Sequence, residues 1–203
     1  MGVLTAINKQ IKSMKQPTGN SKENAVRSCR NLFLDHPDYE SGTYWIDPNL
    51  GCTDDAIQVF CDKITKETCI RSESNIVTNA TWYSGTPKRI YYSSMRGGER
   101  FVYAEKSQLI FMRLLSIRAR QTVTFYCRNV VADLELLSST DEVIRNLESE
   151  VNGCQFTSDT WGKTVLTYST DTTENLPFKD FSVGDIGADN QEFGLEMGPV
   201  CFA

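Results

Sequence analysis

Seven cysteines in a chain of 203 residues constrain this sequence more than any other feature. No two of them form a Cys-x-x-Cys pair, so their spacing favours disulfides over a zinc site or a dithiol redox motif. The odd count leaves one thiol outside intrachain pairing, and spacing alone does not choose among the many connectivities of the other six. The cysteines, together with a sequon that makes Asn79 a candidate glycosylation site, predict a secreted protein.

Length, charge and histidine content exclude several classes of protein. The chain length suits one domain with at most a short appendage. A net charge of −5 argues against a nucleic-acid partner held by phosphate contacts. The single histidine, His36, excludes a multi-histidine zinc site. The sequence has no apolar run of about 18 residues, so we predict no membrane-spanning helix.

Known catalytic motifs are missing from the sequence. It contains no Gly-x-Ser-x-Gly, His-Glu-x-x-His, Walker A loop or glycine-rich dinucleotide turn. A nucleophilic unpaired cysteine would need His36 as its base, but His36 directly precedes Pro37 in a turn-like stretch and is interpreted as a surface residue. We therefore predict that the protein is not an enzyme.

The N-terminal segment has a helical hydrophobic pattern. Leu4, Ile7, Ile11 and Met14 follow one another at spacings of three or four residues, and residues 17–20 end the pattern. Such a stripe is typical of a short coiled coil. The pattern fits either an oligomerising stalk or an amphipathic helix packed on its own domain, and by itself it leaves both open.

The rest of the chain predicts an α+β fold dominated by antiparallel strands and loops. Aromatic and β-branched runs predict strands at 43–46, 89–92, 101–103, 122–126 and 164–168. Apolar spacing predicts short helices at 54–63, where Thr53 would be the cap, and at 140–151. The glycine- and aspartate-rich stretch 180–203 is predicted to be irregular.

Residues 45–55, with the sequence WIDPNLGCTDD, place oxygen-bearing side chains among turn residues. Asp47, Asn49 and Asp55 can converge with backbone carbonyls on one hard cation, because calcium accepts about six to eight oxygen ligands in irregular loops. The segment is not an EF-hand, since the sixth position counted from Asp47 is Cys52 rather than glycine. An Asx-rich turn before a capped helix is the alternative, and the segment alone leaves both open.

Specific motifs are spread along nearly the whole chain. The longest is Ser-Gly-Thr-Tyr-Trp-Ile-Asp-Pro-Asn-Leu-Gly-Cys at 41–52. The others lie at 29–32, 36–37, 55–56, 59–61, 67–70, 111–116, 126–129, 153–154, 161–165, 176–177, 185–187, 191–194 and 198–202. Together they resemble the C-terminal propeptide of fibrillar collagens, the COLFI domain. The resemblance implies a fibrinogen-like petal of antiparallel strands with short helices, on a short coiled-coil stalk.

The function that this resemblance implies is a calcium-binding, disulfide-bonded trimerisation domain that associates and registers three procollagen chains and nucleates triple-helix folding. Residues 1–20 would be the stalk and linker, and residues 21–203 the COLFI domain. We expect secretion to the extracellular matrix and a homotrimer, with a heterotrimer of related chains as the second option. The alternative from another class is a secreted calcium-dependent recognition module, fibrinogen-like or lectin-like, that binds a carbohydrate or protein ligand.

The resemblance also implies roles for single residues. It places the calcium ligands on the side chains of Asp47, Asn49 and Asp55 and on the backbone carbonyls of Leu50 and Cys52. Calcium is therefore the expected cofactor.

The same resemblance implies the intrachain disulfides Cys29–Cys61, Cys69–Cys201 and Cys127–Cys154. Cys52 is then the unpaired cysteine. In the family its counterpart bonds to a cysteine of a neighbouring chain, and the matching position here is Asp35. We therefore expect no interchain bridge of that kind.

Two segments, 101–112 and 127–154, are shorter than in vertebrate members of the family. The first overlaps the variable segment implicated in choosing partner chains, so the resemblance leaves partner selectivity open. We expect contacts between petals near residues 103–108 and 116–120.

Overall fold

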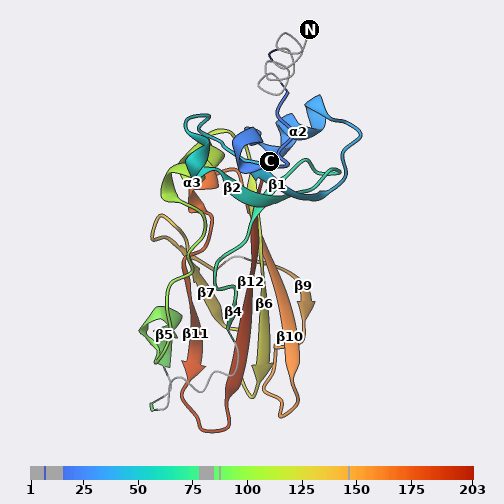
Figure 1. The fold of residues 1–203 in the computed structure, drawn as a ribbon. Coiled ribbons are helices and arrows are strands. Elements are labelled where there is room, and N and C mark those ends of the chain that lie inside the picture. Colours follow the sequence, from blue (N-terminus) through green and yellow to red (C-terminus); the bar gives the residue numbers. More distant parts are fainter. Residues whose placement is uncertain (1–6, 8–15, 78–84, 87, 146) are drawn as a thin grey trace. The chain divides into compact units, whose positions relative to one another are not determined.

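The chain divides into two compact units in this computed structural model, which describes residue 7 and residues 16–77, 85–86, 88–145 and 147–203 (Figure 1). The first unit comprises Met1–Ile70, Ala104–Ile117 and Cys201–Ala203, and the second comprises Arg71–Tyr103 and Arg118–Val200. Within the described ranges, no helix is both long and apolar enough to cross a membrane.

The strands of the first unit form an antiparallel meander. β1 (Gly42–Ile46) pairs with β2 (Ile57–Cys61), and β2 pairs with β3 (Thr68–Ile70). The register places Ile46 opposite Ile57, so the loop between β1 and β2 begins and ends at the same edge of the hairpin. The two ends of this loop are therefore held close together.

Short helices accompany these strands. They are the 3-10 turns η1 (Lys22–Asn24) and η2 (Thr53–Asp55) and the α-helices α2 (Cys29–Asp35) and α3 (Lys106–Leu114). α2 begins after Ser28, whose side-chain oxygen accepts a hydrogen bond from a backbone N–H of the first turn.

The second unit contains two sets of antiparallel strands. In the larger set the order is β12-β6-β10-β9, with β4 also paired to β12. These strands are β4 (Ile76–Val77), β6 (Ala119–Arg128), β9 (Glu148–Asn152), β10 (Gly162–Thr170) and β12 (Glu192–Phe202), whose last two residues belong to the first unit. The smaller set, in the order β5-β11-β7-β8, contains β5 (Lys88–Tyr91), β7 (Leu134–Leu137), β8 (Val143–Ile144) and β11 (Asp180–Ile186). Two 3-10 turns, η3 (Tyr92–Ser94) and η4 (Thr173–Asn175), complete the unit.

Aromatic side chains form the core between the two sets of strands. Phe193 on β12 meets Phe181 on β11 edge to face, with ring centroids 6.3 Å apart, and stacks with Phe125 on β6 at 5.8 Å. All three rings are buried. This core explains the alternation along β6, where every second residue from Ala119 to Cys127 is buried.

The predicted fold class is confirmed, because the described chain is α+β with mostly antiparallel strands and short helices. The predicted strands at 43–46, 89–92, 122–126 and 164–168 correspond to β1, β5, β6 and β10. The predicted strand at 101–103 is wrong. Phe101 and Tyr103 are buried there without belonging to a strand, so their apolar pattern reflects burial rather than strand pairing.

Both predicted helices are wrong. Segment 54–63 contains the end of η2 followed by strand β2, and segment 140–151 contains strand β8 and most of β9. In β2, Val59 and Cys61 are buried while Gln58 and Phe60 are exposed, which is the period of a strand. Pairing with neighbouring strands therefore overrides the helical spacing of the apolar residues.

The C-terminal stretch 180–203, predicted to be irregular, contains the long strands β11 and β12. A glycine inside one of these strands permits close approach of two backbones. A Cβ atom on Gly198 of β12 would lie 2.5 Å from the carbonyl oxygen of Thr122 on β6. The close approach of β12 to β6 therefore requires a glycine at position 198.

Candidate metal site

The predicted cation-binding segment is the loop between β1 and β2. Where β1 ends, the N–H of Asp47 donates to the carbonyl of Val26 at 2.7 Å, and the N–H of Val26 donates to the carbonyl of Trp45 at 3.1 Å. A parallel bridge between Val26 and Ile46 accompanies these bonds. The backbone that carries Asp47 is therefore held by Val26 through two hydrogen bonds.

The carboxylate of Asp47 is buried, with 2% of the residue exposed. Its Oδ1 accepts a long hydrogen bond, 3.3 Å, from Nε2 of Gln108 on α3. A buried carboxylate is costly unless it is paired with positive charge or strong donors, and one distant neutral amide offers little compensation. This environment favours a cation beside Asp47.

Asn49 connects the remaining predicted side chains. Its Nδ2 donates to Oδ2 of Asp55 at 3.0 Å, and its Oδ1 accepts from the N–H of Gly51 at 3.3 Å and from Nε2 of Gln108 at 3.5 Å. The structure thus brings the three predicted side-chain ligands into one network.

The two predicted carbonyl ligands, on Leu50 and Cys52, lie in two successive turns, 47–50 and 52–55. Leu50 has a φ of 53°, a left-handed conformation that is uncommon for leucine, and its side chain is exposed. Its N–H donates to the carbonyl of Asp47 at 3.2 Å, while the carbonyl of Cys52 accepts from the N–H of Asp55 at 3.4 Å. Turn hydrogen bonds, rather than packing of the Leu50 side chain, hold this conformation.

Two buried oxygen atoms of the network have no hydrogen-bond partner among the described residues: Oδ1 of Asp55 and Oε1 of Gln108. An unsatisfied buried acceptor costs about 1–3 kcal/mol, so two in one cluster need a physical reason. Both atoms are hard oxygen acceptors, which a calcium ion could satisfy together with the other loop oxygens. The residues present therefore fit calcium.

An open hollow of about 550 Å³ lies beside the loop and offers an entry path for an ion. Its lining residues are Pro17, Glu23, Asn24, Ala25, Asp47, Leu50, Gly51 and Thr53. The pKa of Glu23 lies below its usual range, because the carboxylate accepts hydrogen bonds from its own backbone and from Ser21. Glu23 is therefore charged at neutral pH and makes the potential in the hollow more negative.

Sequence reasoning did not identify Gln108 as part of this site. Gln108 and Met112 are four residues apart on the buried face of α3, and both are fully or almost fully buried. Several apolar side chains of α3 are exposed, so the distribution of apolar residues does not indicate which face is buried. Nothing local in the sequence indicates that this face meets the loop.

Three disulfides are present: Cys29–Cys61, Cys69–Cys201 and Cys127–Cys154. They are the pairs that the resemblance implied. Cys52 is free and exposed, and Asp35, at the end of α2, is exposed as well. A carboxylate oxygen of Glu67 lies near the sulfurs of Cys69 and Cys201, but those sulfurs are bonded to each other and are not thiolate ligands.

The predicted stalk falls almost entirely outside the described residues. Ile7 is helical and 47% exposed, whereas Leu4, Ile11 and Met14 lie outside the description. Asn79 lies outside it too. The stalk, the boundary at residue 20 and the glycosylation site therefore stay predictions.

His36 contacts two other residues, Pro17 through Nε2 and Tyr39 through ring stacking. Its Nε2 lies 3.1 Å from the carbonyl oxygen of Pro17, and its ring stacks on Tyr39 with centroids 4.7 Å apart. Since a carbonyl only accepts hydrogen bonds, this Nε2 carries the proton.

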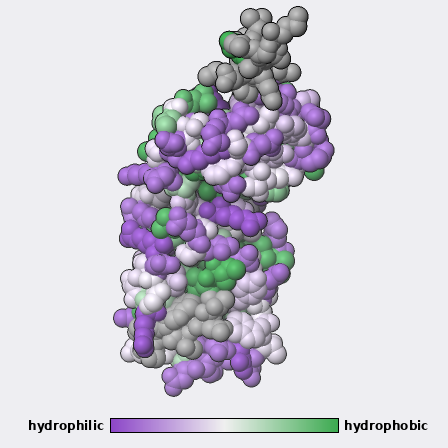
Figure 2. All heavy atoms as spheres, viewed as in Figure 1, coloured by the Kyte–Doolittle hydropathy of each residue, from purple (hydrophilic) through white to green (hydrophobic). Residues whose placement is uncertain are grey.

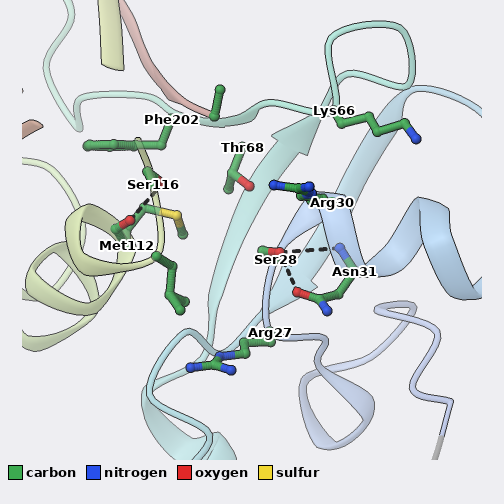
Figure 3. A pocket seen from close by; sticks show the side chains of 11 residues that line it. Arg27, Ser28, Arg30, Asn31, Lys66, Thr68, Met112, Ser116 and Phe202 are labelled. Atoms are coloured by element: carbon green, nitrogen blue, oxygen red, sulfur yellow. Dashed lines mark hydrogen bonds between the residues drawn. The ribbon is translucent and has the colours of Figure 1, made fainter. Parts of the chain in front are cut away.

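A second pocket in the first unit is lined by residues of α2, α3 and the loop around Lys66 (Figure 3). Ser28 Oγ donates to Asn31 Oδ1 at 2.7 Å and accepts the N–H of the same residue at 3.3 Å. Arg27 and Arg30 also line it. At about 90 Å³ the pocket has room for only a few water molecules.

The second unit has an apolar groove of about 380 Å³. It is lined by Ile76, Val77, Tyr126, Trp161, Gly194, Leu195 and Glu196. Ile76 is 60% exposed and Trp161 51% exposed. Hydrophobic side chains gather over β4 and β12 in the space-filling view (Figure 2), which is typical of a surface that contacts another molecule.

Comparison with known proteins gives a consistent set of relatives. The rabbit (Oryctolagus cuniculus) collagen alpha-2(I) chain is 38% identical over 228 residues, covering 98% of this chain and 43% of that relative. Collagen alpha-1(II) chains are 38% identical in Xenopus tropicalis and 36% identical in Gallus gallus over 229 residues, covering 98% of this chain and 15% and 26% of those relatives. The chain thus spans less than half the length of these relatives. The alignments are longer than the chain, so the relatives contain residues that it lacks.

The family match is equally extensive. Residues 1–202 match the family described as the fibrillar collagen C-terminal domain. This match includes the β1–β2 loop, both units of the fold and all six disulfide-bonded cysteines. The chain therefore belongs to the family of fibrillar collagen C-terminal domains.

Proposed function

We propose that this chain is a calcium-binding, disulfide-bonded trimerisation domain that associates and registers three procollagen chains and nucleates triple-helix folding. The observation that carries the proposal is the family match over residues 1–202. Three relatives that cover almost the whole chain are collagen chains by name, and collagens are structural proteins.

Trimerisation has a clear physical use for a collagen. The triple helix winds three extended chains without a preformed core, so unassisted nucleation needs three chain ends to meet at once. Holding the chains at one point replaces that encounter with a high effective local concentration. A domain at the C-terminal end also gives all three chains a common starting register.

Exposed apolar residues near α3 support a contact between chains. Ile110, Phe111 and Leu114 on α3 are 43%, 39% and 71% exposed, and Ile117 just beyond it is 81% exposed. Exposed apolar side chains so close together are typical of an interface. Each of the two expected contact segments has exposed residues, 105–107 in the first and Ile117 and Arg118 in the second. We expect a homotrimer, with a heterotrimer of related chains as the second option.

Calcium would be held by the side chains of Asp47, Asn49 and Asp55 with the carbonyls of Leu50 and Cys52. The support is the buried carboxylate of Asp47 and the unpartnered Oδ1 of Asp55. An ion bound there would neutralise the two carboxylates and stiffen the β1–β2 loop.

Light scattering in calcium and in excess chelator tests this proposal. We expect the mass of three chains in calcium and a shift toward single chains in chelator. A single-chain mass at high protein concentration in calcium would contradict trimerisation and favour the calcium-dependent recognition module. A trimer unaffected by chelator would contradict the role of calcium in assembly.

A pair of neighbouring carboxylates provides the matched variants. Asp55→Asn removes a proposed ligand and should weaken calcium binding at least about tenfold. Asp54→Asn changes the same charge at an exposed residue outside the network and should change affinity little. Isothermal titration with calcium measures both, and equal affinities for the two variants would contradict the assignment of Asp55.

A further inference from the structure

We propose that Gln108 is an additional ligand of the calcium ion, so that the ion bonds helix α3 to the β1–β2 loop. This inference rests on the calcium binding proposed above and adds a residue to it from a distant part of the chain. Gln108 lies 61 residues from Asp47 in sequence and is fully buried.

The two ends of the Gln108 side-chain amide differ in their hydrogen bonding. Nε2 donates to Asp47 and Asn49, whereas Oε1 is buried without a partner among the described residues. The buried Gln121 of the second unit differs. Its Nε2 donates to Tyr103 Oη at 2.6 Å, and its Oε1 accepts the N–H of Phe178 at 2.9 Å. Both ends of a buried glutamine amide are thus hydrogen-bonded elsewhere in this chain, whereas Oε1 of Gln108 has no partner among the described residues.

The number of ligands leaves room for another oxygen, from a side chain or from water. The loop offers five: three side chains and two carbonyls. Calcium takes about six to eight oxygen ligands. Gln108 is the neighbouring side chain that contacts both Asp47 and Asn49 and has an unused oxygen. It is therefore the side chain placed to supply a sixth ligand that water would otherwise provide.

The spacing of the atoms fits this role. A half-turn of the Gln108 amide exchanges its oxygen and nitrogen positions, which are nearly equivalent in shape. Oε1 would then occupy a position 3.3 Å from Asp47 Oδ1 and 3.5 Å from Asn49 Oδ1. Oxygens bound side by side to calcium at about 2.4 Å are roughly 3–3.5 Å apart. Positive charge between these atoms favours the orientation with oxygen inward.

The consequence is a link between the ion and the exposed face of α3. Gln108 and Met112 lie on the buried face of this helix, and Ile110, Phe111 and Leu114 are exposed. A ligand on the buried face would fix the helix and the exposed side chains that it carries. Calcium would then stabilise the surface proposed to meet another chain.

Terbium luminescence tests the ligand directly, because terbium replaces calcium at oxygen sites and its decay in H₂O and D₂O counts the bound water molecules. Gln108→Leu removes the oxygen, so water should take its place and the count should rise by about one. Calcium affinity, measured by isothermal titration, should fall at least about tenfold. Gln108→Asn, which keeps an amide but withdraws it by one methylene, should give the same two changes.

Gln121→Leu is the control, since it also removes a buried glutamine amide but lies in the second unit. It should lower thermal stability and leave the water count unchanged. Water counts equal to wild type in both Gln108 variants would overturn the proposal, even if affinity falls. A wild-type protein that binds neither terbium nor calcium would instead overturn the proposed calcium function itself.

Discussion

Among the tyrosines of the described residues, Tyr103 has the most strongly raised pKa. Burial raises the pKa of its hydroxyl well above the ordinary value, although the hydrogen bond from Gln121 acts in the opposite direction. In the unfolded chain the phenol ionises near pH 10. Above that pH the unfolded state loses a proton that the folded state keeps, so the contribution of Tyr103 to stability is complete below about pH 10 and falls as pH rises.

The free energy of unfolding should fall less steeply at alkaline pH in the variant Tyr103→Phe than in the wild type. At neutral pH the variant should be about 1 kcal/mol less stable, because Gln121 loses a hydrogen-bond acceptor. Above about pH 10 the difference from wild type should narrow. Urea unfolding between about pH 7 and 11 measures this. The exposed Tyr126 provides the control variant Tyr126→Phe. If the free energy of unfolding of Tyr103→Phe differed from wild type by the same amount across that pH range, the proposed effect of Tyr103 burial would be contradicted.

Strand β12 depends on a glycine for its approach to β6. A Cβ at Gly198 would lie 2.5 Å from the Thr122 carbonyl oxygen, and backbone cannot move aside cheaply. We expect Gly198→Ala to lower the free energy of unfolding by about 1–3 kcal/mol, measured by chemical denaturation. Gly42→Ala in β1 is the control, since its nearest new contact is an ordinary 3.6 Å. Equal effects of the two variants would contradict the steric argument.

The wrong predictions at the level of elements share a cause. Apolar residues at 56–60 have a spacing that fits a helix, and glycines in 180–203 suggest loops. Each signal is local, whereas β2 and β12 exist because other strands pair with them. Strand pairing is a non-local interaction and overrides weak local preference.

Cys52 bears on whether the three chains of the proposed trimer are joined by disulfides. It is free and exposed, and the position that carries its expected partner is Asp35. On a non-reducing gel we therefore expect the protein to migrate as a single chain, even when light scattering in calcium gives a trimer. Asp35→Cys is the matched variant and should produce a covalent trimer. A covalent trimer of the wild-type protein would contradict this prediction.

Membership of the family of fibrillar collagen C-terminal domains indicates where the protein is located. Collagens are secreted proteins of the extracellular matrix, which confirms the predicted localisation. The disulfide bonds of the structure suit that oxidising environment. Assembly through calcium and packing is a proposal within that setting.

The sequence by itself determined the family, the α+β class and the loop with its three oxygen-bearing side chains. These depend on residues close together in the chain, such as the segment 41–52 and Asp55 just beyond it. Only the tertiary structure decided that 180–203 forms long strands and that Gln108 of α3 contacts Asp47. The reason is physical: pairing of strands and burial of a helix face join residues far apart in sequence, and local patterns do not encode which of them meet.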